Sequence, residues 1–340
     1  MPTHDQQSPS PTLRTPQFVQ VYREDELALR AELTRGLLQS QAHCSPKFLY
    51  DALGSRLFEA ITELPEYYPT RTEAVLFAAH ATAMAQVVPR HATLIDLGAG
   101  NCNKAAALFQ HFAPERYVAV DISVHFLKSA LECLQRQHPG LEMWGLGTDF
   151  SSGLHLPPSV QAAASGARLL FYPGSSIGNF TPEEALGFLQ TVRAACGQDP
   201  GSGLLIGVDL VKDTRVLEAA YDDALGVTAA FNLNLLLHLN RLLKADFRLQ
   251  DWQHVACYDR GLDRIEMHLQ ARRDLTVRWH DEHDQPRERA FPAGQTLHTE
   301  NSCKWTLDGF TSLLRLAGFG PIQHWTDADR LFAVFWARAH

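Results

Sequence analysis

Apolar residues recur at helical spacing in the first part of the chain. Residues 25–39 hold five leucines at helix-compatible positions between charged side chains, and residues 51–63 repeat this pattern more weakly. Residues 64–71 contain two prolines that restrict the backbone, which indicates a short loop. A further helix is predicted from Glu73 toward Val88. The amino-terminal region is therefore predicted to be helical.

Strand and helix patterns then alternate along the chain. The predicted elements are strand 93–97, helix 102–112, strand 117–121, helix 123–137, strand 168–172, helix 182–195 and strand 203–210. This alternation is the βαβ rhythm of a mostly parallel sheet.

The rhythm changes after residue 210. Residues 214–240 form a largely apolar helical stretch interrupted at Gly226, and residues 252–295 alternate as strands with turns near residues 260–261 and 283–284. Helix 305–317, which Gly318 ends, and strand 331–337 return to the earlier rhythm. We therefore expect an insertion that contributes to a second domain.

The first predicted strand of the sheet ends in a glycine turn, at Gly98 and Gly100. Glycine lets the backbone approach a ligand closely, and Asp121, at the end of the next strand, is suited to accept hydrogen bonds from a ribose diol. A dinucleotide fingerprint needs a third glycine, and Asn103 stands there instead. Together with Asp96, the D-x-G-x-G turn favours S-adenosylmethionine over NAD.

Composition limits the classes of partner. The chain has 340 residues, of which 45% are hydrophobic and 20% charged, which is enough for a large core in two domains. The net charge is −8 and no long run of Lys or Arg occurs, so we expect no nucleic-acid partner. No apolar run reaches the ~20 residues that span a bilayer, so no membrane association is expected. Without a sustained heptad or an exposed apolar stripe, a monomer is expected.

The polar, proline-containing residues 1–19 indicate a disordered tail. Six cysteines show neither C-x-x-C spacing nor a regular framework, which favours reduced thiols and a cytoplasmic location.

No metal site is expected, because no histidine pair has the spacing of a helical metal site. Separate segments carry His111, His125, His155, His254 and His268.

Several further segments resemble a known family in an ordered set. The chain is similar to the histidine-specific Nα-methyltransferases of ergothioneine biosynthesis from about Ser45 to the last strand. The matching segments are residues 47–51 (KFLYD), 64–71 (LPEYYPTR), 174–179 (GSSIGN), 209–213 (DLVKD), 221–223 (YDD), 264–267 (RIEM) and 299–304 (TENSCK).

The resemblance implies an α/β fold, in which a Rossmann-like class I methyltransferase sheet is joined to an α+β substrate-binding domain. It implies a cofactor domain over residues 72–210, completed by residues 304–340. The substrate-binding domain would comprise residues 20–71 and 211–303, with the active site between the two domains.

The resemblance also implies the ligands and their contacts. S-adenosylmethionine would be held by Gly98, Gly100, Lys104, Asp121, Asp149 and Phe150. The α-amino and α-carboxylate groups of L-histidine would be held by Tyr67, Asn179 and Tyr221, and the imidazole by Glu300 and Ser302. Tyr50 and Met267 are expected to line the same pocket. Each assignment is chemically sensible, since amide, hydroxyl and carboxylate groups supply the donors and acceptors required.

The implied reaction is trimethylation of L-histidine to hercynine, by direct transfer of methyl groups to an amine lone pair. Three alternatives remain open. A relative acting on a tryptophan derivative would need an apolar pocket floor, where burying the unpaired Glu300 carboxylate would cost free energy. An NAD-dependent oxidoreductase is disfavoured by Asn103. A catalytically silent nucleoside-binding module would bind S-adenosylmethionine without turnover.

Overall fold

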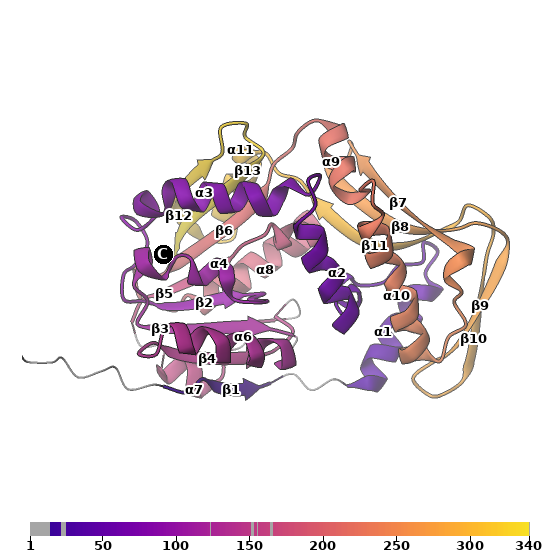
Figure 1. The fold of residues 1–340 in the computed structure, drawn as a ribbon, viewed down its shortest axis with the longest axis horizontal. Coiled ribbons are helices and arrows are strands. Elements are labelled where there is room, and N and C mark those ends of the chain that lie inside the picture. Colours follow the sequence, from indigo (N-terminus) through magenta and orange to yellow (C-terminus); the bar gives the residue numbers. More distant parts are fainter. Residues whose placement is uncertain are drawn as a thin grey trace, which may run out of the picture.

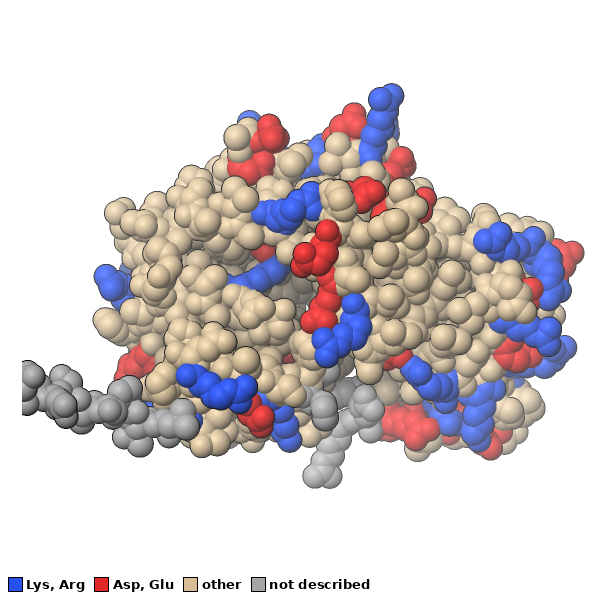
Figure 2. Space-filling model, viewed as in Figure 1, with Lys and Arg blue, Asp and Glu red and all other residues tan. Residues whose placement is uncertain are grey.

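The computed structural model describes residues 14–21, 25–122, 124–150, 153–154, 156–163 and 166–339. Over these residues the chain forms two parts, a large sheet covered by helices and a smaller part built around two small sheets (Figure 1). No helix in the described ranges is long and apolar enough to cross a membrane. The surface is hollowed where the two parts meet, and acidic and basic side chains gather beside the hollow (Figure 2).

The large sheet contains eight of the described strands in the order β1-β4-β3-β2-β5-β6-β13-β12. Strands β1 to β6 run parallel, whereas β13 is antiparallel to β6 and β12 is antiparallel to β13. The strand order reverses between β2 and β5, and ligands of open α/β sheets bind beyond the carboxyl ends of strands at such a reversal. The strands are β1 (Gln17–Gln20), β2 (Thr93–Leu97), β3 (Arg116–Asp121), β4 (Glu142–Gly147), β5 (Arg168–Tyr172), β6 (Gly203–Asp209), β12 (Phe319–Thr326) and β13 (Phe332–Ala339).

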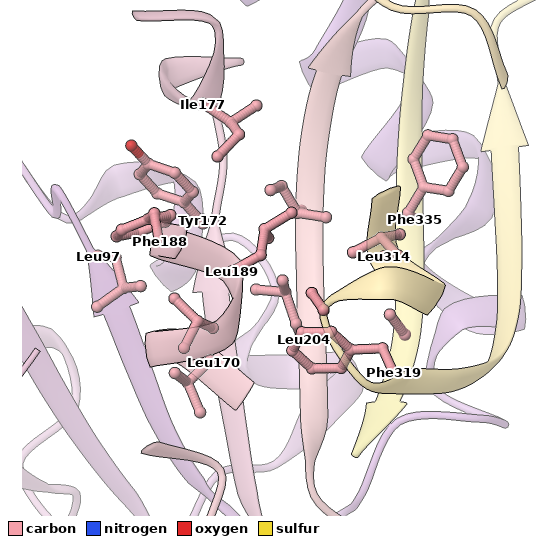
Figure 3. Close-up of a cluster of buried hydrophobic side chains, with 14 of the residues drawn as sticks. Leu97, Leu170, Tyr172, Ile177, Phe188, Leu189, Leu204, Leu314, Phe319 and Phe335 are labelled. Carbon is pink, nitrogen blue, oxygen red and sulfur yellow. The ribbon is translucent and has the colours of Figure 1, made fainter. Parts of the chain in front are cut away.

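Helices cover both faces of this sheet. Apolar side chains of α3, α4, α5 and α6 pack on one face, and those of α7, α8 and α11 pack on the other. Figure 3 shows part of the second layer, where Phe188 and Leu189 of α8 and Leu314 of α11 lie against strand side chains such as Leu204. The helices are α3 (Tyr68–Met84), α4 (Asn103–Ala106), α5 (Phe109–Phe112), α6 (Val124–Gln137), α7 (Pro158–Ala163), α8 (Pro182–Ala195) and α11 (Leu307–Leu316), with the 3₁₀ helix η2 (Ser176–Asn179).

The smaller part has its own apolar core, drawn from residues 33–68 and 217–297. Its helix α10 packs on a three-stranded antiparallel sheet, β11-β8-β7, and a hairpin of β9 and β10 lies beyond it. The elements are α1 (Glu26–Leu38), η1 (Pro46–Leu49), α2 (Ala52–Thr62), α9 (Thr214–Tyr221), α10 (Val227–Leu243), η3 (Leu249–Asp251), β7 (Trp252–Asp259), β8 (Arg264–Ala271), β9 (Leu275–His280), β10 (Pro286–Phe291) and β11 (Thr296–Cys303).

The predicted parallel sheet and the change of pattern after residue 210 are confirmed, and three predictions differ in detail. Helix α3 begins five residues earlier than predicted, at Tyr68, because Pro69 is tolerated in the first helical turn. The helix predicted over 102–112 is divided into α4 and α5 by a tight turn in which the Leu108 N–H donates to the Ala105 carbonyl. Strands β4, β11 and β12 were not predicted as separate strands.

The expected tail over residues 1–19 is corrected at its end. Residues 1–13 lie outside the described residues, but Gln17–Gln20 form β1, paired in parallel with β4. The edge of the sheet at β4 has room for an aromatic ring because Gly145 has no side chain. A Cβ at Gly145 would lie only 2.5 Å from the Phe18 ring. Two half-buried apolar residues are enough to anchor this short edge strand.

Candidate active site

The glycine turn after β2 and Asp121, the last residue of β3, lie together beside the strand reversal. Gly98 and Gly100 have φ of 72° and 51°, in the left-handed region that favours glycine. The Gly100 N–H donates to Asp121 Oδ2 at 2.9 Å, which fixes the turn against the neighbouring strand. A Cβ at Gly100 would meet nothing within 4 Å, so the backbone is open to a ligand.

Phe150 and Asp149 approach this turn from the segment after β4. The Phe150 Cζ lies 3.6 Å from where a Cβ of Gly98 would stand, and the Phe150 ring packs 5.9 Å from the Tyr172 ring. Asp149 Oδ2 lies 3.7 Å from Lys47 Nζ, which comes from the smaller part. Five of the six residues expected to hold S-adenosylmethionine are therefore neighbours along this edge.

Lys104, the sixth, is tied to the same edge through a residue that the sequence analysis missed. Lys104 Nζ lies 2.6 Å from Glu73 Oε2, and Glu73 Oε1 accepts the Gly174 N–H at 2.7 Å. Glu73 is almost fully buried on α3. Glu73 thereby joins the helix after β2 to the glycine loop after β5. In the sequence, the one sign that Glu73 is buried is its position on the apolar face of a predicted helix.

Asp96 of the D-x-G-x-G motif points into the core. Burial raises its pKa to about 7, although the Tyr117 O–H donates to its Oδ2 at 2.7 Å and opposes that rise. Because Asp96 is buried, its carboxylate is not open to a ligand.

Three of the substrate residues expected from the resemblance, Met267, Glu300 and Ser302, lie on the inner face of the β8-β11 pair. The register places Glu300 opposite Met267, with Ser302 two residues further along β11 on the same face. Glu300 is 7% exposed, and burial raises its pKa from 4.5 to about 7 against the opposing effect of Lys304. In the orientation that satisfies its neighbours, the Asn179 amide donates to Glu300 Oε1 at 3.3 Å. The other oxygen, Oε2, is buried with no hydrogen-bond partner in the described part of the chain.

An aromatic cluster lies beside these groups. The Tyr50 ring lies 5.5 Å from those of Phe58 and Phe231, the Phe58 and Tyr67 rings are 6.1 Å apart, and the Tyr67 and Tyr221 rings are also 6.1 Å apart. These rings come from residues 50–67 and 221–231, and burial raises the pKa of the Tyr50, Tyr67 and Tyr221 hydroxyls well above 10. The hydroxyls are therefore neutral donors and acceptors at any physiological pH.

A buried lysine organises two of the expected substrate contacts. Lys304 Nζ donates to Ser302 Oγ at 2.7 Å and to Tyr221 Oη at 3.1 Å, and it lies 2.9 Å from Asp209 Oδ2. The hydroxyl oxygens of Tyr221 and Ser302 are themselves 2.7 Å apart. All three ammonium hydrogens are thus used, and both hydroxyls are held in place.

Asp209, at the end of β6, anchors this arrangement. It accepts from the Tyr68 hydroxyl at 2.7 Å and pairs with Lys212 as well as with Lys304. Although burial opposes ionisation, the two lysines hold the pKa of Asp209 below its ordinary value, and burial lowers the pKa of Lys212 to about 8. Lys304 and Asp209 stood in the quoted motifs without an assigned role, since only the folded chain brings residues 209 and 304 together.

Two cavities lie elsewhere in the described part of the chain, and neither contains the polar groups described above. One of about 670 Å³ lies between the segment after α10 and the β9-β10 hairpin, and one of about 300 Å³ is lined by Phe150 and by residues of α8. The glycine loops, Glu300 and Lys304 line neither cavity. The candidate site is defined by its polar contacts instead.

Comparison with known proteins identifies the family. A family model described as histidine-specific methyltransferase, SAM-dependent, matches residues 29–339. A histidine N-alpha-methyltransferase of Mycolicibacterium smegmatis is 40% identical over 306 residues, covering 88% of this chain and 91% of that protein. One of Mycobacterium tuberculosis is 38% identical over 314 residues, covering 88% and 92%. Ergothioneine biosynthesis protein 1 of Neurospora crassa is 30% identical over 293 residues, covering 82% of this chain and 31% of that protein. The chain therefore belongs to the SAM-dependent histidine-specific methyltransferases.

Proposed function

We propose that this enzyme transfers methyl groups from S-adenosylmethionine to the α-amine of L-histidine, forming trimethylhistidine (hercynine) in ergothioneine biosynthesis. The observation that carries the choice of substrate is Glu300, a buried carboxylate with one oxygen lacking a hydrogen-bond partner among the described residues. Such a group costs free energy unless a donor meets it. An imidazole N–H is a donor of the required kind, and its hydrogen bond favours the ionised form of Glu300.

The neighbouring hydroxyls support the same ring. Ser302 Oγ accepts from Lys304 and shares a hydrogen bond with Tyr221, so when Tyr221 donates, the Ser302 hydrogen is directed to a ligand acceptor. Glu300 accepting one ring N–H and Ser302 donating to the other ring nitrogen together match a neutral imidazole. An indole ring offers one N–H and no second ring nitrogen, so it would satisfy only one of the two groups.

The amino-acid end of the substrate is assigned to Tyr67, Tyr221 and Asn179. Their hydroxyl and amide groups supply both donors and acceptors, as binding of a carboxylate and an amine requires. Tyr221 and Ser302 are adjacent, so one hydrogen-bonded unit would contact both ends of a small amino acid. We assign substrate binding to residues 20–71 and 211–303, and cofactor binding to residues 72–210 with 304–340.

The cofactor edge fits S-adenosylmethionine. The open backbone at Gly100 admits a ligand, Asp121 is suited to ribose hydroxyls and Asp149 to an adenine amino group, and Phe150 offers an apolar ring face. The ion pair with Glu73 supports including Lys104 among these contacts. When bound, S-adenosylmethionine supplies an electrophilic methyl group on a sulfonium. The residues of this chain would then hold the neutral α-amine in line with that methyl group, for which no covalent nucleophile is needed.

Repeated methylation requires a pocket that tolerates a growing cation. The Tyr50 and Tyr67 rings lie in one aromatic cluster, and an aromatic face stabilises a quaternary ammonium by about 1 kcal/mol or more. We expect Tyr50→Ala to shift the products from trimethylated toward monomethylated histidine. An unchanged ratio of the two products in a mass spectrum would exclude this role.

The assembly state and location are part of the proposal. We infer a monomer acting on a small molecule, and a cytoplasmic enzyme, because all six cysteines are unpaired thiols and four of them are buried in the core. Light scattering of the purified chain tests the monomer, and fractionation of the producing cells tests the location.

The decisive experiment is to incubate the purified chain with S-adenosylmethionine and each standard amino acid in turn. Mass spectrometry then reports additions of one, two or three methyl groups. Histidine alone gaining three supports the proposal, whereas reaction with tryptophan, or binding of S-adenosylmethionine without any methylated product, refutes the substrate assignment. Glu300→Ala is expected to weaken histidine binding far more than cofactor binding, and equal loss of both would refute the imidazole role.

A further inference from the structure

The outer face of the three-stranded sheet carries side chains of a different chemistry from its inner face. Along β8, Ile265, Met267 and Leu269 are buried and face α10, while the alternate residues Glu266 and His268 project from the opposite face. No step of the proposed reaction uses this outer face. It therefore raises a separate question about ligands.

The strand register gathers metal-ligating groups on that face. Cys257 of β7 stands opposite Glu266, and His298 of β11 stands opposite His268. One ligand atom from each of Cys257, Glu266 and His268 lies within 4.8 Å of those of the other two. The His268 and His298 ring centroids are 5.1 Å apart. Two cross-strand pairs, adjacent along one strand, thus place a thiol, a carboxylate and two imidazoles in one patch.

The hydrogen bonds within the patch leave binding capacity. His268 Nδ1 is buried with no hydrogen-bond partner among the described residues, and His268 Nε2 lies 2.9 Å from Glu266 Oε2. Arg264 contacts only the other carboxylate oxygen, Oε1, through its Nε at 2.8 Å and its Nη2. A cation bound between Glu266 Oε2 and His268 would therefore replace one hydrogen bond, while Arg264 continued to orient the carboxylate. His298 Nε2 lies 2.9 Å from Asn301 Oδ1, so binding through this nitrogen would replace that contact as well.

We propose that this patch binds one Zn²⁺ ion through Cys257, Glu266 and His268, with His298 as the fourth ligand. Thiolate, imidazole and carboxylate are the ligands that Zn²⁺ takes in proteins. Metal–ligand bonds of about 2.0–2.3 Å place tetrahedral ligand atoms about 3.3–3.8 Å apart. Glu266 Oε2 and His268 Nε2, which are 2.9 Å apart, must therefore separate slightly, and the Cys257 thiol, within 4.8 Å of both groups, must approach them by up to about 1 Å. Changes of rotamer supply this movement, since Cys257 is exposed and the other two side chains are 18% and 13% exposed.

The site would lie directly behind the proposed substrate pocket. Glu266 and His268 flank Met267 on β8, and His298 precedes the register shift that leads to Glu300 on β11. A bound ion would tie together the two strands that present these pocket residues. The proposal does not depend on which amino acid is methylated.

Metal titration tests the site directly. The full-length chain without a histidine tag is stripped with a chelator and titrated with Co²⁺ and then Zn²⁺ at about pH 7.5, where the ligands can lose their protons. We expect one Co²⁺ per chain with a thiolate-to-cobalt charge-transfer band, which Zn²⁺ abolishes by displacement. Binding of more than one ion, or a spectrum without the thiolate band, would overturn the proposal.

Two variants and a matched control locate the ion. Cys257→Ser is expected to remove the charge-transfer band, and His268→Asn to weaken Zn²⁺ binding by at least about tenfold. Cys133→Ser is the control, because Cys133 is also an exposed thiol but lies on α6, away from the patch. A band that persists in Cys257→Ser or disappears in Cys133→Ser would refute the assignment. Both outcomes are read from metal binding alone, so they are independent of the proposed methyl transfer.

Discussion

Replacing Glu300 with Gln is expected to change how the stability of the ligand-free protein depends on pH. Burial raises the pKa of this carboxyl from 4.5 to about 7, so the folded protein holds the group in its neutral form over a range where the unfolded chain ionises it. Folding is therefore opposed by ionisation of Glu300 as the pH rises. Glutamine removes the titration while keeping nearly the same volume.

The magnitude follows from the two pKa values. The interval from 4.5 to about 7 corresponds to about 3 kcal/mol, and the group is buried enough for this conversion to apply. Because the folded-state pKa is the higher one, the penalty is absent below pH 4.5, grows through the interval and is complete above about pH 7. The buried glutamine amide adds an offset that does not vary with pH.

The measurement is urea unfolding of the wild type and Glu300→Gln at several pH values between about 4.5 and 8. The stability of the variant relative to the wild type should rise by about 3 kcal/mol across that range, while its histidine affinity falls. Glu132→Gln, an exposed position on α6, serves as the matched control and should show no such trend. If the difference in the free energy of unfolding between Glu300→Gln and the wild type stayed constant with pH, the raised pKa of Glu300 would be refuted.

Three further predictions follow from contacts in the site. Lys304→Met removes one of the cations that pair with the buried Asp209 carboxylate and should lower the free energy of unfolding by about 3–5 kcal/mol. Adding Asp209→Asn should recover the stability but not the histidine affinity, which calorimetry measures. Recovery of both would show that Lys304 has only a structural role. Asp121→Ala should weaken S-adenosylhomocysteine binding at least about tenfold, and unchanged binding in a calorimetric titration would contradict its assignment. Gly178→Ala would place a Cβ 2.9 Å from a β11 carbonyl oxygen and should lose about 1–3 kcal/mol in thermal unfolding. The control Gly187→Ala, with open space on α8, should gain up to about 1 kcal/mol.

Periodicity predicted the elements whose pattern is local. Strand 168–172 and helix 182–195 have the predicted bounds, because a short apolar run and a capped amphipathic stretch each carry their own boundary signals. Strand β4 was missed, since Glu142–Gly147 has no alternating pattern and holds two glycines. Edge strand β1 was assigned to a tail because its stability comes from pairing with β4 rather than from its own composition.

Part of the site could likewise be predicted before folding. The glycine turn and Asp121 follow from their places at strand ends, and the ordered motifs indicated the family and the residues expected at the substrate. Their chemical state could not be predicted. The raised pKa of Glu300 arises from burial, and the partners of Lys304 come from segments about 80 to 95 residues away in the chain as well as from the preceding strand, β11.

The sequence by itself determined the sheet rhythm, the nucleoside-binding turn and the family, because each depends on residues close together in the chain. Only the tertiary structure decided the rest. It brought Asp209 to Lys304, buried Glu300 with an unsatisfied oxygen, and gathered Cys257, Glu266, His268 and His298 from three strands. No helical spacing of histidines predicts that last patch, because cross-strand register creates it.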